Sequence, residues 1–259
     1  IFTSGATEAD DTAIIGLALG AQEALRLKGA LPQTPHVIVS AIEHDAVLAP
    51  AHKLETLGFR VTRLGVDAHG FVEVRALEEA LCDDTVLVSV QAANSEVGSI
   101  QPIAQLAALT HAHGALFHTD AVQALGKAPV NVNAWDVDAA SFSAHKLGGP
   151  KGVGILYLRA RTPFEPYMLG GGQESGLRSG TQNVAGVVGC ATAVFDAQSL
   201  QEVESARLRP LRDYLYAELT RLDGVDATVE VEPGSYDFLP NIVHVLVQGL
   251  ESETLILRL

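Results

Sequence analysis

The chain has 259 residues, 47% of them hydrophobic, which suits one large domain or one domain and part of a second. Its 31 acidic residues outnumber 17 basic ones, and the net charge of −14 argues against nucleic acid and anionic membrane surfaces as partners. No apolar run approaches the roughly 18 residues that span a bilayer. The two cysteines have neither disulfide nor metal-binding spacing, so we expect a cytoplasmic protein without a metal site.

Both ends of the chain look unfinished. The first residues already resemble a strand and carry no methionine, and the last residues follow a helical apolar pattern without a stop signal. We therefore expect a fragment of a longer polypeptide.

In the first half of the chain, short β-branched segments alternate with segments of helical period. The pattern predicts strands over 36–42, 60–66, 85–92 and 115–120, and helices over 45–58, 74–81 and 103–113. Such alternation is typical of an α/β protein with a mainly parallel sheet covered by helices on both faces. Ligands of these sheets gather beyond the carboxyl ends of the strands.

The second half has a different rhythm. Two strands, over 138–145 and 153–159, precede a glycine-rich loop over 169–181, and then a helix over 183–198. A separate polar helix over 202–222 follows, and segments 226–231 and 241–248 predict a small sheet. We place a domain boundary near residue 204.

The motif "SGATEAD" (4–10) predicts the end of a strand and the start of a helix. Thr7 and Asp10 have the spacing of a capping box. The free N–H groups and the dipole of such a helix start can bind phosphate. Taken alone, an ordinary helix cap explains the motif more simply.

The motif "FHTDAVQ" (117–123) places Asp120 at the carboxyl end of a strand, with Gln123 close behind. A carboxylate there can keep a pyridine nitrogen protonated. A plain helix cap is an equally good explanation of Asp120 in isolation. His118 shares the strand and face of Asp120, and we assign it no role.

The motif "SFSAHKLGGPKG" (141–152) brings Ser143, His145 and Lys146 out of a strand together. An amine buried at the mouth of a sheet has a lowered pKa and can form a Schiff base. A solvated lysine is the alternative. Thr7, Asp120 and Lys146 lie at three separate strand ends, however, and together they supply what pyridoxal 5'-phosphate requires: an anion site, a pyridinium partner and an amine.

The ordered blocks "SGATEAD", "EHDAVL", "NSEVG", "HTDAVQ", "SFSAHKLGGPKG" and "RSGT" resemble those of the cysteine desulfurases, class V aminotransferase-like enzymes that serve iron–sulfur cluster assembly. The resemblance runs over nearly the whole chain. It implies a pyridoxal-phosphate fold type I large domain over 1–204, lacking its N-terminal part, and an incomplete small domain over 205–259.

The resemblance also implies an activity and partners. Such enzymes remove sulfur from L-cysteine, giving L-alanine and an enzyme persulfide that a scaffold or carrier protein accepts. Selenocysteine lyase and other class V lyases share these blocks and stay open as alternatives. A catalytically silent cofactor-binding partner subunit is a third possibility.

The resemblance assigns roles to single residues. Lys146 would bind the cofactor aldehyde covalently, Asp120 would face the pyridine nitrogen, and Gln123 would contact the phenolic oxygen. His44 would stack on the ring and assist proton transfer. Thr181 would reach the phosphate of a neighbouring subunit, which implies a homodimer with shared sites. The remaining phosphate ligands would be Ala6, Thr7, Ser143 and His145.

The chain departs from the family pattern in two respects. Asn94 and Ser95 stand where the family commonly has two asparagines, and the second usually contacts the cofactor ring, so Ser95 puts that contact in doubt. The later segments with the catalytic cysteine and the arginine that grips the substrate carboxylate are absent. Cys82 and Cys190 occupy neither place, so we expect the chain as given to bind cofactor without turnover.

Overall fold

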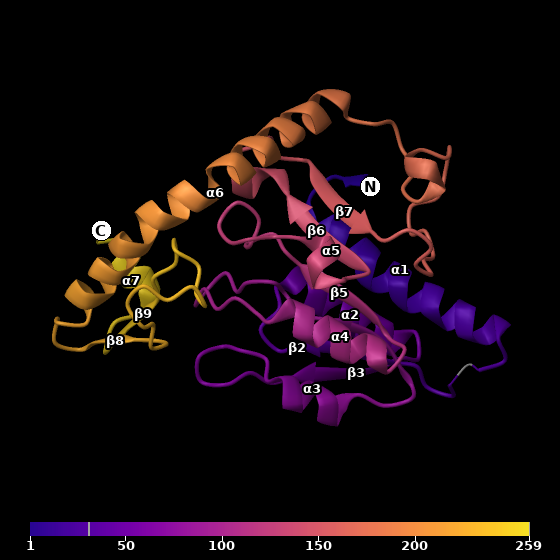
Figure 1. Cartoon of the computed structure of the whole chain (residues 1–259), viewed down its shortest axis with the longest axis horizontal. Coiled ribbons are helices and arrows are strands. Elements are labelled where there is room, and N and C mark those ends of the chain that lie inside the picture. Colours follow the sequence, from indigo (N-terminus) through magenta and orange to yellow (C-terminus); the bar gives the residue numbers. More distant parts are fainter. Residues whose placement is uncertain (31, 259) are drawn as a thin grey trace.

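A seven-stranded sheet forms the centre of the computed structural model, which describes residues 1–30 and 32–258 (Figure 1). The strands are β1 (Phe2–Thr3), β2 (His36–Ser40), β3 (Arg60–Leu64), β4 (Thr85–Ser89), β5 (Leu116–Asp120), β6 (Ala139–Ser143) and β7 (Gly154–Leu158). Their order across the sheet is β1-β7-β6-β5-β4-β2-β3. The pairs from β3 to β6 are parallel, and β7 and β1 join antiparallel. The prediction of a mainly parallel α/β sheet is confirmed.

Helices cover both faces of this sheet. They are α1 (Ala6–Leu27), α2 (Asp45–Thr56), α3 (Val74–Ala80), α4 (Ile103–Ala112) and α5 (Val132–Trp135). Strand β2 is buried along its whole length because successive side chains enter two different cores. Val37 and Val39 pack in the core with α1 and α2, and Ile38 packs in the other with α3 and α4.

One long helix, α6 (Val184–Leu219), replaces the two helices predicted over 183–198 and 202–222. Pro210 lies inside it without ending it. Helix α6 runs along the edge of the molecule, and most residues in its middle are exposed to solvent (Figure 1). The periodic apolar pattern that marks a helix is therefore weak there, and the sequence analysis took this weak stretch for a break between two helices. The boundary predicted near residue 204 falls within α6, and the division into domains stays a prediction.

Beyond α6 the chain forms the small sheet that the sequence predicts. Strands β8 (Val225–Ala227) and β9 (Val245–Val247) pair antiparallel, and helix α7 (Ser252–Ile256) follows. Figure 1 shows this sheet at the far end of α6, away from α1. Within residues 1–30 and 32–258, none of the helices has the length and hydropathy needed to cross a bilayer.

Candidate active site

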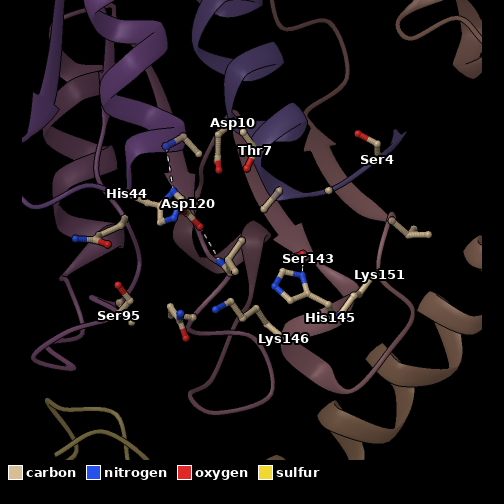
Figure 2. Close-up of a pocket in the computed structure, with 18 of the residues that line it drawn as sticks. Ser4, Thr7, Asp10, His44, Ser95, Asp120, Ser143, His145, Lys146 and Lys151 are labelled. Atoms are coloured by element: carbon tan, nitrogen blue, oxygen red, sulfur yellow. Dashed lines mark hydrogen bonds between the residues drawn. The ribbon is translucent and has the colours of Figure 1, made fainter. Parts of the chain in front are cut away.

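A cavity of about 730 Å³ lies at the carboxyl ends of the parallel strands, beneath the start of α1 (Figure 2). This volume is in the range of small-molecule and cofactor sites. All the predicted site residues line it except Asn94 and Thr181. The predicted residues that do line it are Ala6, Thr7, His44, Ser95, Asp120, Gln123, Ser143, His145 and Lys146.

The start of α1 offers free backbone donors to this cavity. Gly5 is the N-cap and no side chain caps the helix, so the predicted Thr7–Asp10 capping box is wrong. Instead, the N–H of Ser4 donates to Glu8 Oε2 at 2.7 Å, and Arg178 Nε donates to Glu8 Oε1 at 2.6 Å. Although burial opposes it, these hydrogen bonds lower the pKa of Glu8.

Strand β7 supports the turn before α1 from below. A Cβ atom at Gly154 would lie 2.4 Å from the carbonyl carbon of Gly5, closer than real Cβ atoms come to another backbone. Only glycine therefore allows β7 to pair with β1 and still pass beneath this turn. The contact fixes the direction in which the first N–H groups of α1 point.

Asp120 ends β5 in a buried position on the cavity wall. The N–H of Val122 donates to its Oδ1 at 2.9 Å. Burial raises the pKa of Asp120, while the Val122 amide and the nearby His44 and Lys146 oppose the rise. Asp120 therefore caps the following turn and also lines the cavity, and its role beside a pyridine nitrogen stays a prediction.

His44 is the N-cap of α2 and also lines the cavity. Its Nδ1 accepts a hydrogen bond from the N–H of Ala46 at 3.0 Å. Because Nδ1 is the acceptor, a neutral His44 carries its proton on Nε2. The ring lies close to Asp120 (Figure 2).

Strand β6 ends at Ser143, and the short 3-10 helix η1 (Ala144–Leu147) follows directly and contains His145 and Lys146. Ser143 Oγ and His145 Nδ1 are 2.7 Å apart. Lys146 lines the cavity together with Thr7 and Asp120, but its side chain is exposed. The prediction of a buried amine is wrong, because η1 forms the open rim of the cavity rather than its floor.

Asn94 and Ser95 have different positions. Asn94 does not line the cavity: its Nδ2 donates to the carbonyl of Ile42 at 3.2 Å, and its Oδ1 accepts from the N–H groups of Glu96 and Val97 at 2.9 Å each. It thereby holds the loop together. Ser95 lines the cavity, as the residue in the aligned place.

Thr181 lies outside the main cavity. It lines a smaller hollow of about 160 Å³ that shares Ser4, Gly152 and Val153 with the main cavity. Its side chain is exposed. The single chain therefore brings Thr181 close to the predicted anion site without placing it inside.

Two buried acids, Asp10 on the cavity wall and Glu43 outside its lining, are the main feature that the sequence analysis missed. Asp10 lines the cavity with both carboxyl oxygens unpartnered among the described residues, and burial, followed by repulsion from Asp120, raises its pKa well above the ordinary value. Glu43 accepts hydrogen bonds from Ser40 Oγ at 2.5 Å and Gln91 N at 2.7 Å. Burial raises its pKa to about 8. The signal in the sequence was the presence of an acidic residue at the edge of each of two largely apolar stretches, at Asp10 and at Glu43.

His118 is buried next to Asp10. Its Nδ1 is 2.9 Å from Ser89 Oγ and its Nε2 is 3.0 Å from Ser141 Oγ. Burial lowers the pKa of His118 to about 3, so the ring is neutral. It lies 3.6 Å from the Asp10 carboxyl without forming an ion pair. Across residues 1–30 and 32–258, no three His, Cys, Asp or Glu side chains are grouped as a metal site requires.

Comparison with known proteins agrees with this geometry. The family described as aminotransferase class V matches residues 1–259. The chain therefore belongs to the class V aminotransferase family, whose members depend on pyridoxal phosphate. Within that family it is similar to the cysteine desulfurases IscS of Dictyoglomus turgidum, 43% identical over 259 residues, and Salmonella arizonae, 42% identical over 261 residues. These matches confirm the resemblance inferred from the sequence.

Both relatives are longer than the chain. All of this chain is covered in each comparison, but it spans only 63% and 61% of their respective lengths. Among solved structures, the match with a NifS-like protein covers 98% of this chain and 67% of the NifS-like chain, with a TM-score of 0.87 and 38% identity. The match with DndA from Streptomyces lividans covers 99% of this chain and 70% of DndA, with a TM-score of 0.84 and 36% identity.

Proposed function

We propose that this protein is a pyridoxal-phosphate-dependent cysteine desulfurase of the cytoplasm. It removes sulfur from L-cysteine, leaves L-alanine, and passes the sulfur through an enzyme persulfide to a scaffold or carrier protein for iron–sulfur cluster assembly. The observation that carries the proposal is the convergence of Lys146, Asp120 and the start of α1 on one cavity. The similarity to proteins named cysteine desulfurase supports L-cysteine as the substrate.

The residues of the cavity fit the phosphate of the cofactor. The first N–H groups of α1, at Ala6 and Thr7, carry no side-chain cap and lie at the positive end of the helix dipole. Ser143 adds a hydroxyl that His145 orients. These groups would hold the phosphate while Arg178 neutralises Glu8 next to them.

The ring and aldehyde also find partners. Asp120 would face the pyridine nitrogen, His44 would cover the ring, and Gln123 would donate to the ring oxygen. When bound, the cofactor supplies an aldehyde for amines and an electron sink. Lys146 would hold that aldehyde, and its amine and His44 Nε2 are the groups of this chain placed to carry protons at the substrate.

Sulfur transfer requires a thiolate. The Cβ–Sγ bond of cysteine breaks, the thiolate takes the sulfur atom as a persulfide, and the bonding electron pair stays on carbon, where a proton completes alanine. Neither Cys82 nor Cys190 lines the cavity, and Cys190 is buried in α6. We place the accepting thiol in the part of the desulfurase length that this chain does not span.

Exposed apolar side chains on α6 support the proposed homodimer. Large apolar side chains are exposed along the helix: Val184, Val188, Phe195, Leu200, Val203, Leu211 and Tyr214. An exposed apolar surface of this kind is typical of a protein interface. Thr181 lies in the glycine-rich loop directly before α6, so a second copy docked against the start of α6 would lie next to that loop.

The test uses purified full-length protein. We expect a visible absorbance from the lysine-bound cofactor that changes on addition of cysteine, with release of alanine and sulfide. Lys146→Ala should lose both the absorbance and the alanine, whereas Lys53→Ala, on the exposed face of α2, should keep them. A Lys146→Ala protein that keeps the absorbance after dialysis would refute the proposal. A preference for selenocysteine over cysteine would favour the lyase alternative.

A further inference from the structure

Lys127, in the segment after β5, lies close to the cavity without lining it, unlike Lys146 and Lys151. Its Nζ donates a hydrogen bond to Gln123 Oε1 at 2.7 Å. A protonated amine has only donors, so the amide atom that faces it must be the oxygen. The amide nitrogen of Gln123, which carries two donors, is the group left for the cavity that Gln123 lines.

The backbone around Lys127 is held firmly under α6. Gly126 has a φ of +74°, and a Cβ atom there would lie 2.9 Å from the Cβ of Ala197 in that helix. The carbonyl oxygen of Lys127 accepts hydrogen bonds from Ser205 Oγ at 2.8 Å and Gln201 Nε2 at 3.3 Å. The backbone of Lys127 is therefore fixed, and its side chain reaches Gln123 from a fixed origin.

The environment of the Lys127 amine is unfavourable for a cation. The side chain is partly buried, and its described hydrogen-bond partner is the neutral amide of Gln123. Burial, with a smaller contribution from the charge of Lys146, lowers the pKa of Lys127 to about 8. A lysine side chain near the surface ordinarily keeps its charged amine in water, whereas the amine of Lys127 is partly buried against Gln123.

We propose that Lys127 is a positioning residue that fixes the Gln123 amide so that its N–H groups donate to an anionic oxygen on an aromatic ring in the cavity. The inference rests on the proposed function, in which that oxygen is the phenolic oxygen of pyridoxal phosphate. Lys127 does not touch the ring oxygen itself. Its hydrogen bond to Oε1 prevents the Gln123 amide from rotating by 180°, an orientation in which the amide oxygen would face the anionic ring oxygen.

Loss of Lys127 would let the amide rotate and weaken the hydrogen bond to the ring oxygen. The hydrogen bond is weakened rather than removed, so we expect roughly tenfold weaker cofactor binding, which corresponds to about 1.4 kcal/mol. Because Lys127 works only through Gln123, the effects of removing either residue should not add.

The experiment measures the dissociation constant of pyridoxal phosphate for the cofactor-free full-length protein by fluorescence titration. It compares wild type, Lys127→Met, Gln123→Leu and the double variant. We expect each single variant to bind about tenfold more weakly, and the double variant to bind no worse than Gln123→Leu. Lys127→Arg should restore most of the affinity, and Lys53→Met should bind as wild type does.

A spectroscopic measurement separates positioning from a merely structural role. The pH titration of the visible band of the bound cofactor reports protonation next to the ring oxygen, and it should shift alike in Lys127→Met and Gln123→Leu. Unchanged affinity in Lys127→Met, or additive losses in the double variant, would overturn the inference while leaving the proposed function intact. Failure of the wild type to bind pyridoxal phosphate would overturn both.

Discussion

Replacing Asp10 with asparagine should stabilise the cofactor-free protein increasingly as the pH rises. Asp10 is fully buried, and neither carboxyl oxygen has a hydrogen-bond partner among the described residues. Burial raises its pKa well above the ordinary value, and the neighbouring Asp120 adds to the rise. Asparagine has a similar volume and never ionises, so the difference between the two proteins reports the Asp10 proton together with its effect on the neighbouring Asp120.

The sign and slope follow from linkage. An unfolded Asp10 releases its proton near the ordinary pKa of 3.8, whereas the folded chain still holds it at higher pH. Between pH 3.8 and the higher pKa of folded Asp10, the folded wild type binds up to one proton more than the unfolded chain. The stability of the wild type therefore falls with rising pH relative to that of Asp10→Asn. The difference should approach about 1.4 kcal/mol per pH unit before it levels off above the folded pKa.

Urea unfolding of both proteins at a series of pH values from about 4 to 8 measures this difference. Asp11→Asn is the matched control, because Asp11 is the next residue of α1 and is only partly buried. Burial raises the pKa of Asp11 too, though less, so its difference curve should level off at lower pH. A flat curve for Asp10→Asn, or one that falls with pH, would show that Asp10 is ionised in the folded protein and refute the reasoning.

Further variants test the anion site and the interface. Gly154→Ala forces a Cβ against the backbone of Gly5, so we expect about 1–3 kcal/mol lower stability in urea unfolding and weaker cofactor binding; a fully stable variant would contradict the contact. Arg178→Ala leaves Glu8 as an unpaired anion beside the phosphate site, and cofactor affinity should fall about tenfold, less in high salt; salt-independent binding equal to wild type would count against that site. Val188→Asp, among the exposed apolar side chains of α6, should shift the protein from dimer to monomer in sedimentation, and an unchanged dimer would exclude this surface.

The sequence predicted the sheet and most of the cavity wall because both depend on local patterns. Fully buried parallel strands such as β2 and β4 read as unbroken β-branched runs. Their carboxyl ends meet at one edge, so polar residues that follow them, such as Asp120 and Lys146, could be grouped without knowing the tertiary structure. The small sheet at the end of α6 was found in the same way.

Features that depend on distant contacts were missed. The predicted Thr7–Asp10 capping box does not form because the N-cap is Gly5, which has no side chain, and Thr7 lies inside the helix. The contact of Glu8 with Arg178, 170 residues away in the chain, has no local sequence signal. The exposure of Lys146 depends on how η1 sits on the rim, which no local pattern encodes. Lys127 follows Gln123 by four residues, and that spacing was a visible signal for their contact.

The most direct test of the central claim is to identify the lysine that binds the cofactor. Full-length protein is loaded with pyridoxal phosphate, reduced with borohydride, digested, and its peptides are examined by mass spectrometry. We expect the pyridoxyl-phosphate mass increment on the peptide that contains Lys146, and no increment on that peptide in Lys146→Ala. An increment on Lys127, on Lys151, which also lines the cavity, or on no lysine at all would contradict the account.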